Sequence, residues 1–341
     1  MDFSRQKSDT MKIIDDYIAY VRDMRRYSQR TAAIYEAVLT DYHRFVSREG
    51  VVDTDEEFAS SFNVSEIRQY EVEMLDGKNA RSARTVNLHL SALSGFCRYL
   101  MQRGLLKSNP VKLVTKPKVE KRLPQFFRKD AMDGYFQVSD HLLDSSEFNA
   151  FLNEHDTESG RNYYGKLLER LIVSSLYSLG IRRAELIGLS IGDMDFARNV
   201  VKVRGKGDKM REIPLVPSLS EEILLYLKAV EVMCGGERSL KEPLFVTYKG
   251  AQLYPAYVDR AVKSALGGQK DIRGRKSPHV LRHSLATELM NGDTGLNSIK
   301  ELLGHSSLAA TQVYTHSSIA RLKDSYERAH PRAKNGGKHG D

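Results

Sequence analysis

Apolar and polar positions alternate with helical spacing through the N-terminal part of the chain. Between residues 11 and 27, apolar side chains recur every three or four positions with charged residues between them, which predicts one amphipathic helix. Ser28 is the expected N-cap of a second helix, and weaker patterns at 64–75 and 82–101 predict two more. We therefore expect four short helices packed as a compact bundle.

The remaining sequence has helical periodicity except in one segment with the period of a β-strand. Residues 163–179 predict a long helix that ends at Gly180. Residues 199–216 (NVVKVRGKGDKMREIPLV) alternate on both sides of Gly-Lys-Gly-Asp, which predicts a β-hairpin with a basic tip. The fold class is thus mainly α with a small antiparallel β-sheet. Further helices are expected at 218–233, 255–266, 279–291, 296–303, 307–314 and 318–328.

Length and composition favour two domains and an anionic partner. A chain of 341 residues is long enough for two cores. We expect an N-terminal helical domain at 1–113, a basic linker at 114–128, a second domain at 129–330 and a flexible tail at 331–341. The formal charge of +8 favours a polyanion, although a merely basic protein would have the same sign.

Charge is distributed unevenly around the predicted linker. Residues 78–128 contain twelve lysines and arginines against one acidic residue, so this stretch is expected to lie against phosphates; the alternative is an ordinary solvated linker. Residues 129–160 contain eight acidic residues and one lysine, which predicts a surface that avoids DNA and faces solvent or a partner. The expected DNA-contacting residues, including two near the hairpin tip, are Arg81, Arg84, Lys116, Lys118, Lys121, Arg122, Lys209 and Arg211.

Several classes of protein are disfavoured. Cys97 and Cys234 have no CxxC or metal-ligand spacing, so we expect no metal site and a reducing compartment. The chain has no apolar run of about 18 residues, and MDFSRQKSDT has no signal-peptide core, so we expect a cytoplasmic protein without membrane contact. Gly-rich phosphate loops, paired metal-binding carboxylates and HExxH are absent from the sequence, which disfavours a metal-dependent nuclease.

One ordered set of residues is suited to attack on a phosphodiester. The hydroxyl of Tyr314, with an ordinary pKa near ~10, is a nucleophile only when it faces a neutralised phosphate. Arg182 and Arg282 each present a planar fork that fits the non-bridging phosphate oxygens.

Proton transfer has its own candidates. Lys206 on the hairpin tip can protonate the leaving 5′ oxygen, and His279 can accept the tyrosine proton or hold a phosphate oxygen. His305 can donate a further hydrogen bond. Each residue alone has a structural alternative, such as pairing of Arg182 with Glu185 or a core position for Tyr314, and it is their joint order that favours catalysis.

These segments carry a family resemblance. The chain resembles the tyrosine recombinases of the phage-integrase superfamily, and within that superfamily it resembles the bacterial Xer chromosome-dimer recombinases. Four segments resemble the catalytic boxes of these enzymes: LGIRRAEL, VRGKGDKMREIPL, HVLRHSLAT and LLGHSSLAATQVYTH. RSARTVNLHLSALSGFCRYL and the ending YERAHPRAK extend the resemblance over nearly the whole chain.

The resemblance implies a C-shaped clamp around double-stranded DNA, with an integrase-like catalytic domain, and a 3′-phosphotyrosyl link at Tyr314. Glu185 would support the site. No cofactor or ATP is implied. Four protomers, identical or paired with a paralogue, would recombine short inverted-repeat sites through a Holliday junction, with a DNA translocase as a further partner.

Three functional readings remain open from the sequence. The first is a recombinase that resolves chromosome or plasmid dimers, or integrates a mobile element. The second is a type IB topoisomerase, which uses a similar residue set. The third is a DNA-binding architectural protein without activity, which the filled catalytic positions disfavour.

Overall fold

The described part of the chain forms two compact units. The computed structural model describes residues 11–48, 52–77, 80–119, 125–205, 208–291 and 302–303. The division between the units falls after Arg122. Within the described residues the chain is mainly helical with a three-stranded antiparallel sheet, so the predicted fold class is confirmed.

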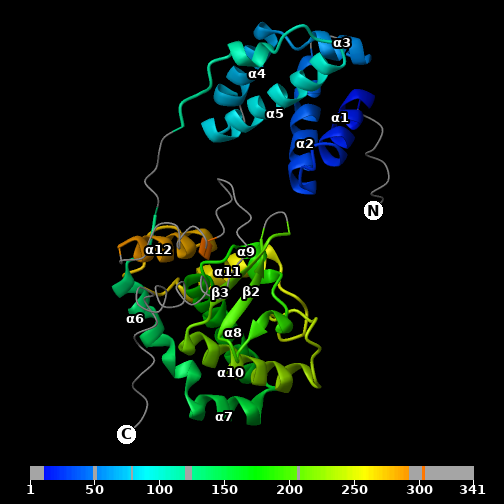
Figure 1. Ribbon diagram of the computed structural model, residues 1–341. Helices are drawn as coiled ribbons and strands as arrows, with labels where there is room; N and C mark the ends of the chain where they lie inside the picture. Colours follow the sequence, from blue (N-terminus) through cyan, green and yellow to red (C-terminus); the bar gives the residue numbers. More distant parts are fainter. Residues whose placement is uncertain are drawn as a thin grey trace. The chain divides into compact units, whose positions relative to one another are not determined.

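The N-terminal unit is a helical bundle (Figure 1). The predicted N-cap is confirmed, because the side chain of Ser28 accepts a hydrogen bond from the Thr31 backbone at 3.2 Å. All four predicted helices are present, together with a short one that we did not predict, which begins at a Thr54–Glu57 capping box. The described elements are α1 (Lys12–Asp23), α2 (Gln29–Val46), α3 (Asp55–Ser60), α4 (Val64–Asp76), α5 (Ala83–Gln102) and the 3-10 helix η1 (Pro110–Leu113).

The predicted linker at 114–128 is packed at both ends. Val114 is buried in the core of the N-terminal unit, and the carbonyl of Pro117 accepts a hydrogen bond from Asn87 on α5 at 3.0 Å. At the other end Phe127 is buried in the C-terminal unit, where its N–H donates to Ser284 Oγ at 2.7 Å. The connection is therefore shorter than the sequence pattern indicated.

The C-terminal unit is built around α8, which contacts α7, α10, α11 and α12 (Figure 1). Its sheet has the order β1-β2-β3, and β2 and β3 form the predicted hairpin. The described elements are α6 (Lys129–Ser139), the 3-10 helix η2 (Asp140–Leu143), α7 (Ser145–Glu154), α8 (Glu158–Leu179), α9 (Arg183–Ile187), the 3-10 helix η3 (Ile191–Asp193), β1 (Met194–Asp195), β2 (Val200–Arg204), β3 (Met210–Pro214), α10 (Pro217–Cys234), α11 (Pro255–Ala265) and α12 (Pro278–Asn291).

The acidic stretch 129–160 contributes to this core as well as to the surface. Its apolar side chains Met132, Tyr135 and Phe151 are buried with those of α8. Arg170 of α8 is 1% exposed and donates through Nη2 to Asp140 Oδ1 at 2.7 Å. One of the acidic residues thus neutralises a buried cation, and describing the stretch only as a surface was incomplete.

The remaining predicted elements lie largely outside the described residues. These are the helices at 307–314 and 318–328, all of 296–303 except its last two residues, and the tail at 331–341.

Candidate active site

A tight turn at Gly180 brings together three segments that are distant in sequence. Gly180 ends α8 with φ 59°, in the left-handed region that favours glycine. A Cβ at this position would lie 2.8 Å from Leu285 Cδ2 and 2.9 Å from Leu303 Cδ2. Glycine therefore allows α12 and Leu303 to approach the turn, and the chain then passes directly to Arg182 at the start of α9.

The carboxylate of Glu185 organises this region. Arg182 donates to it twice, from its backbone N–H to Oε2 at 2.8 Å and from Nη1 to Oε1 at 2.7 Å. Arg211 donates from Nη2 to Oε2 at 2.8 Å and from Nη1 to Oε1 at 3.2 Å. Burial by itself raises the pKa of the Glu185 carboxyl, but the hydrogen bonds and charges of the two arginines outweigh burial and hold this pKa below its ordinary value. Glu185 is thus an ionised anchor for two guanidinium groups.

The position of Arg211 corrects one sequence-based expectation. We expected this residue at a DNA-contacting surface, but it is only 7% exposed. Its Nε donates to the carbonyl of Leu302 at 3.0 Å, and both Nη atoms bind Glu185. All three guanidinium nitrogens of Arg211, Nε included, donate to protein acceptors, so this side chain belongs to the interior of the site.

Arg282 approaches the same cluster from α12. Its Nη1 donates to the carbonyl of Gly180 and its Nη2 to the carbonyl of Leu303. Burial, together with the positive charges of Arg182 and Arg211, lowers the pKa of the Arg282 guanidinium to about 10, while Glu185 acts in the opposite direction. Arg282 remains charged at neutral pH. Three guanidinium groups around one carboxylate leave an excess of positive charge, which is the electrostatic condition for binding an anion.

The other predicted catalytic residues divide into two groups. His279 is exposed in the first turn of α12, three residues before Arg282, so the two positions share one side of the helix. Arg182 keeps 37% side-chain exposure, which leaves it accessible to a ligand. Lys206, His305 and Tyr314 lie outside the described residues.

The N-terminal unit gathers part of the predicted basic surface. Arg84 on α5 is exposed, as are Lys116 and Lys118, and the hydrogen bond from Asn87 to Pro117 holds the two lysines beside α5. Arg81 is more constrained, because its Nη2 pairs with Asp41 at 2.8 Å. Of the other predicted DNA contacts, Lys209 belongs to the C-terminal unit and is exposed beside the hairpin tip. Lys121 and Arg122 lie outside the described residues.

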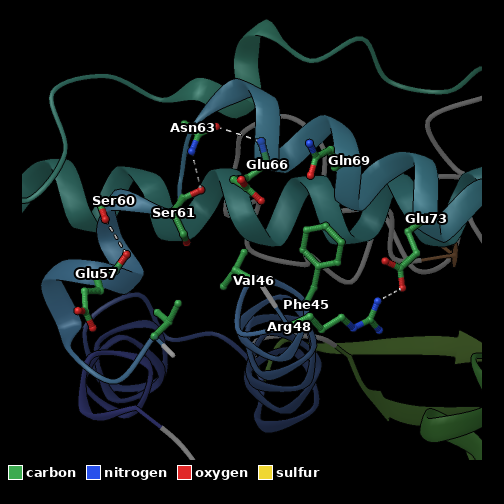
Figure 2. A pocket seen from close by; sticks show the side chains of 11 residues that line it. Phe45, Val46, Arg48, Glu57, Ser60, Ser61, Asn63, Glu66, Gln69 and Glu73 are labelled. Carbon is green, nitrogen blue, oxygen red and sulfur yellow. Dashed lines mark hydrogen bonds and ion pairs between the residues drawn. The ribbon is translucent and has the colours of Figure 1, made fainter. Parts of the chain in front are cut away.

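The N-terminal unit also carries a hollow of about 520 Å³ between the end of α2 and α4 (Figure 2). Its lining includes Glu57, Glu66 and Glu73, and the positive charge of Arg48 is paired with Glu73. This acidic lining repels phosphate, and none of the predicted site residues contributes to it. The hollow is therefore separate from the candidate active site.

Among the residues that the structure describes, no helix is both long enough and apolar enough to cross a membrane.

Two family models match the chain, one within each of its two units. The model described as "Phage integrase family" matches residues 141–321, and "Phage integrase, N-terminal SAM-like domain" matches residues 14–104. The tyrosine recombinase XerC of Chlorobaculum parvum is 31% identical, and the alignment covers 97% of this chain and 98% of that protein. A tyrosine recombinase XerC of Azotobacter vinelandii is also 31% identical, with 94% and 96% covered.

Solved structures show the same fold. The XerH site-specific recombinase in a post-cleavage complex with its difH substrate has a TM-score of 0.58 and 20% identity, covering 92% of this chain and 82% of that one. Lambda integrase (residues 75–356) bound to DNA has a TM-score of 0.57 and 17% identity, covering 93% and 95%.

Proposed function

The chain belongs to the phage integrase family and is a tyrosine recombinase, and from this premise we propose that it performs Xer-type site-specific recombination on duplex DNA. The observation that carries the proposal is the 31% identity with a XerC recombinase over 97% of this chain. The reaction is cleavage and rejoining of DNA strands. Membership of this family disfavours both a type IB topoisomerase and an inactive architectural protein.

The arginine cluster supports the phosphate-binding step. Arg182 and Arg282 are the groups that bind the non-bridging oxygens of the scissile phosphate. In the trigonal-bipyramidal transition state, negative charge builds up on these oxygens, and donors already oriented toward it lower the barrier without a reorganisation cost. Glu185 holds Arg182 in place for this role, and the excess positive charge of the cluster is relieved when the phosphate binds.

The residues that carry out the covalent steps are assigned from their sequence motifs. The hydroxyl of Tyr314 attacks phosphorus, forms a 3′-phosphotyrosyl bond and breaks the bond to the 5′ oxygen. Lys206 supplies the proton that this oxygen takes up, and His279 accepts the proton that the tyrosine loses or holds a phosphate oxygen. His305 donates a hydrogen bond to the phosphate. The adduct retains the energy of the phosphodiester, so attack by a new 5′ hydroxyl rejoins DNA without ATP.

The wider assembly follows from the same premise. The N-terminal domain at 1–113, with Arg84, Lys116 and Lys118, binds the core site, and the catalytic domain at 129–330 closes a clamp on the duplex. Four protomers, identical or alternating with a paralogue, exchange strands at short inverted repeats through a Holliday junction. A DNA translocase is a further proposed partner. The proposed role is the resolution of chromosome or plasmid dimers, and the proposed location is the cytoplasm.

Covalent capture tests this proposal. Cells expressing the wild-type chain or Tyr314→Phe would be lysed under denaturing conditions, and the DNA that remains attached to the protein would be sequenced. We expect recovery at one or a few inverted-repeat sites from the wild type and none from Tyr314→Phe, with duplex binding by the variant within a few-fold of wild type.

The location and pattern of the captured sites distinguish the alternatives. Sites near the replication terminus support dimer resolution, whereas sites at the ends of an element support integration. Scattered recovery across the genome would favour topoisomerase activity, and equal recovery from Tyr314→Phe would contradict the assignment of the nucleophile.

A further inference from the structure

Arg211 occupies a position in β3 where strand alternation favours an apolar side chain. Across the ladder it pairs with Val203, and Ile213 two residues further on pairs with Val201. These three apolar neighbours are buried, and Arg211 is buried with them. Because an unpaired charge is costly in such surroundings, an arginine at this position requires compensating partners.

The partners of Arg211 come from two other segments of the site. Its two Nη atoms bind the two oxygens of Glu185 in a bidentate pair, at 2.8 and 3.2 Å. Its Nε donates to the carbonyl of Leu302, three residues before His305 in the sequence, at 3.0 Å. One side chain therefore joins the β2–β3 hairpin, α9 and the segment that leads to the histidine and tyrosine.

The same pair also lies against the start of the lysine-bearing turn. The Cβ of an alanine at Gly205 would be 3.4 Å from Arg211 Nη1 and 3.7 Å from Glu185 Oε1. The N–H of Gly205 donates to the carbonyl of Lys209 at 2.8 Å, which closes the base of the turn. The residue that immediately precedes Lys206 thus packs on the Arg211–Glu185 pair.

Arg282 completes the connection. It donates to the carbonyl of Leu303, while Arg211 donates to the carbonyl of Leu302. Two consecutive carbonyls are therefore held by arginines from β3 and α12. Arg182 shares both oxygens of Glu185 with Arg211, so a displacement of the carboxylate would displace Arg182 as well.

We infer that Arg211 is a positioning residue for strand cleavage: through Glu185 and the Leu302 carbonyl it holds Arg182 and Arg282 at the separation that a scissile phosphate requires. This inference rests on the proposed function. Arg211 does not touch the DNA and acts through the phosphate-binding arginines. Lysine cannot replace it, because an ammonium group is a point charge and cannot make the two parallel hydrogen bonds to Glu185 together with the bond to Leu302.

The test compares Arg211→Lys with wild type on two DNA substrates. One duplex carries a captured recombination site with an ordinary scissile phosphodiester. The other has a methylphosphonate at that position, which lacks the negative charge that Arg182 and Arg282 neutralise. We expect Arg211→Lys to bind both duplexes within about three-fold of wild type and to cleave the phosphodiester about 100-fold more slowly, the loss typical of a 1 Å misplacement. On the methylphosphonate its loss relative to wild type should be below about five-fold, because the misplaced charges are no longer needed.

Arg198→Lys is the matched control in the same sheet: Arg198 lies between β1 and β2 and pairs with Glu212 of β3. Arg198 also pairs with a glutamate through two nitrogens, at 3.2 and 3.0 Å from Glu212, but its side chain is 43% exposed. Cleavage by Arg198→Lys should stay within about two-fold of wild type. If Arg211→Lys does not fold, Glu185→Gln removes the other half of the pair and should lose more activity on the phosphodiester than on the methylphosphonate.

The outcomes separate this inference from the proposed function. Equal losses on the two substrates would mean that Arg211 only stabilises the fold, and normal phosphodiester cleavage would mean that it positions nothing; either result overturns the inference while leaving the recombinase intact. Absence of any covalent adduct from the wild-type chain would instead overturn the proposed function.

Discussion

Replacing Gly180 with alanine should destabilise the C-terminal unit by an amount that the structure resolves into two parts. The first is conformational: φ 59° places an L-residue in the left-handed region, at a cost of about 1–2 kcal/mol. The second is steric, because the new Cβ would lie 2.8 Å from Leu285 and 2.9 Å from Leu303, and overpacking of this kind costs about 1–3 kcal/mol. The expected loss in free energy of unfolding is therefore about 2–5 kcal/mol.

Gly250→Ala in the same unit isolates the first part. Gly250 also has positive φ, 74°, but its nearest neighbour is Cys234 Sγ at 3.6 Å, an ordinary contact. Its loss should be about 1–2 kcal/mol. Urea unfolding of the full chain, followed by far-UV circular dichroism, measures both variants against wild type.

A functional readout accompanies the stability measurement. The carbonyl of Gly180 accepts a hydrogen bond from Arg282, so relief of the clash would displace that guanidinium. Gly180→Ala should therefore cleave DNA more slowly than Gly250→Ala at a temperature where both are folded. If the two variants lose the same free energy of unfolding, the close approach of α12 and Leu303 to this turn does not constrain the site, and the reasoning fails.

Two further predictions concern proton transfer and pH. Lys206→Ala should slow cleavage of ordinary DNA but cleave a substrate with a 5′ thiolate leaving group at nearly the wild-type rate, since a thiolate needs no proton; a defect that persists on the thiolate substrate would reassign the general acid. Glu185→Gln should lower the free energy of unfolding at neutral pH by about 3 kcal/mol, because it leaves the buried Arg211 without its anion. The folded-state pKa of Glu185 lies below its ordinary 4.5, so its stabilisation is complete above that pH and is lost as the pH falls through the folded pKa. Unfolding curves at several pH values should show the difference between variant and wild type narrowing in acid, and a gap that persists there would assign the stabilisation to packing.

Local sequence patterns were sufficient for most of the described helices and for the hairpin. The Ser28 cap and the alternation on both sides of Gly205 each act over a few residues, so their physical cause is contained in the sequence around them. The short helix α3 was missed although Thr54 and Glu57 form a capping box, because six residues give too little periodicity to be recognised.

The acidic stretch and Arg211 show where this approach fails. Counting charges between 129 and 160 predicted a surface, but it could not show that Asp140, itself exposed, pairs with the buried Arg170 of α8. Arg211 was assigned to DNA because it is basic and close to the hairpin tip. Its phase in β3, shared with Ile213, was the available signal that it faces inward.

The sequence alone determined the order and spacing of the candidate groups: two arginines proposed to bind phosphate, and a lysine, histidines and a tyrosine in family motifs. It also determined most of the helices, because capping and amphipathic burial depend on neighbouring residues. Only the tertiary structure decided that Arg211 supports Glu185 instead of contacting DNA, and that Gly180 allows Leu285 and Leu303 to pack against the turn. These relations join residues that are tens of positions apart, and no local preference specifies them, since they arise when separate elements pack and a buried charge must find its partner.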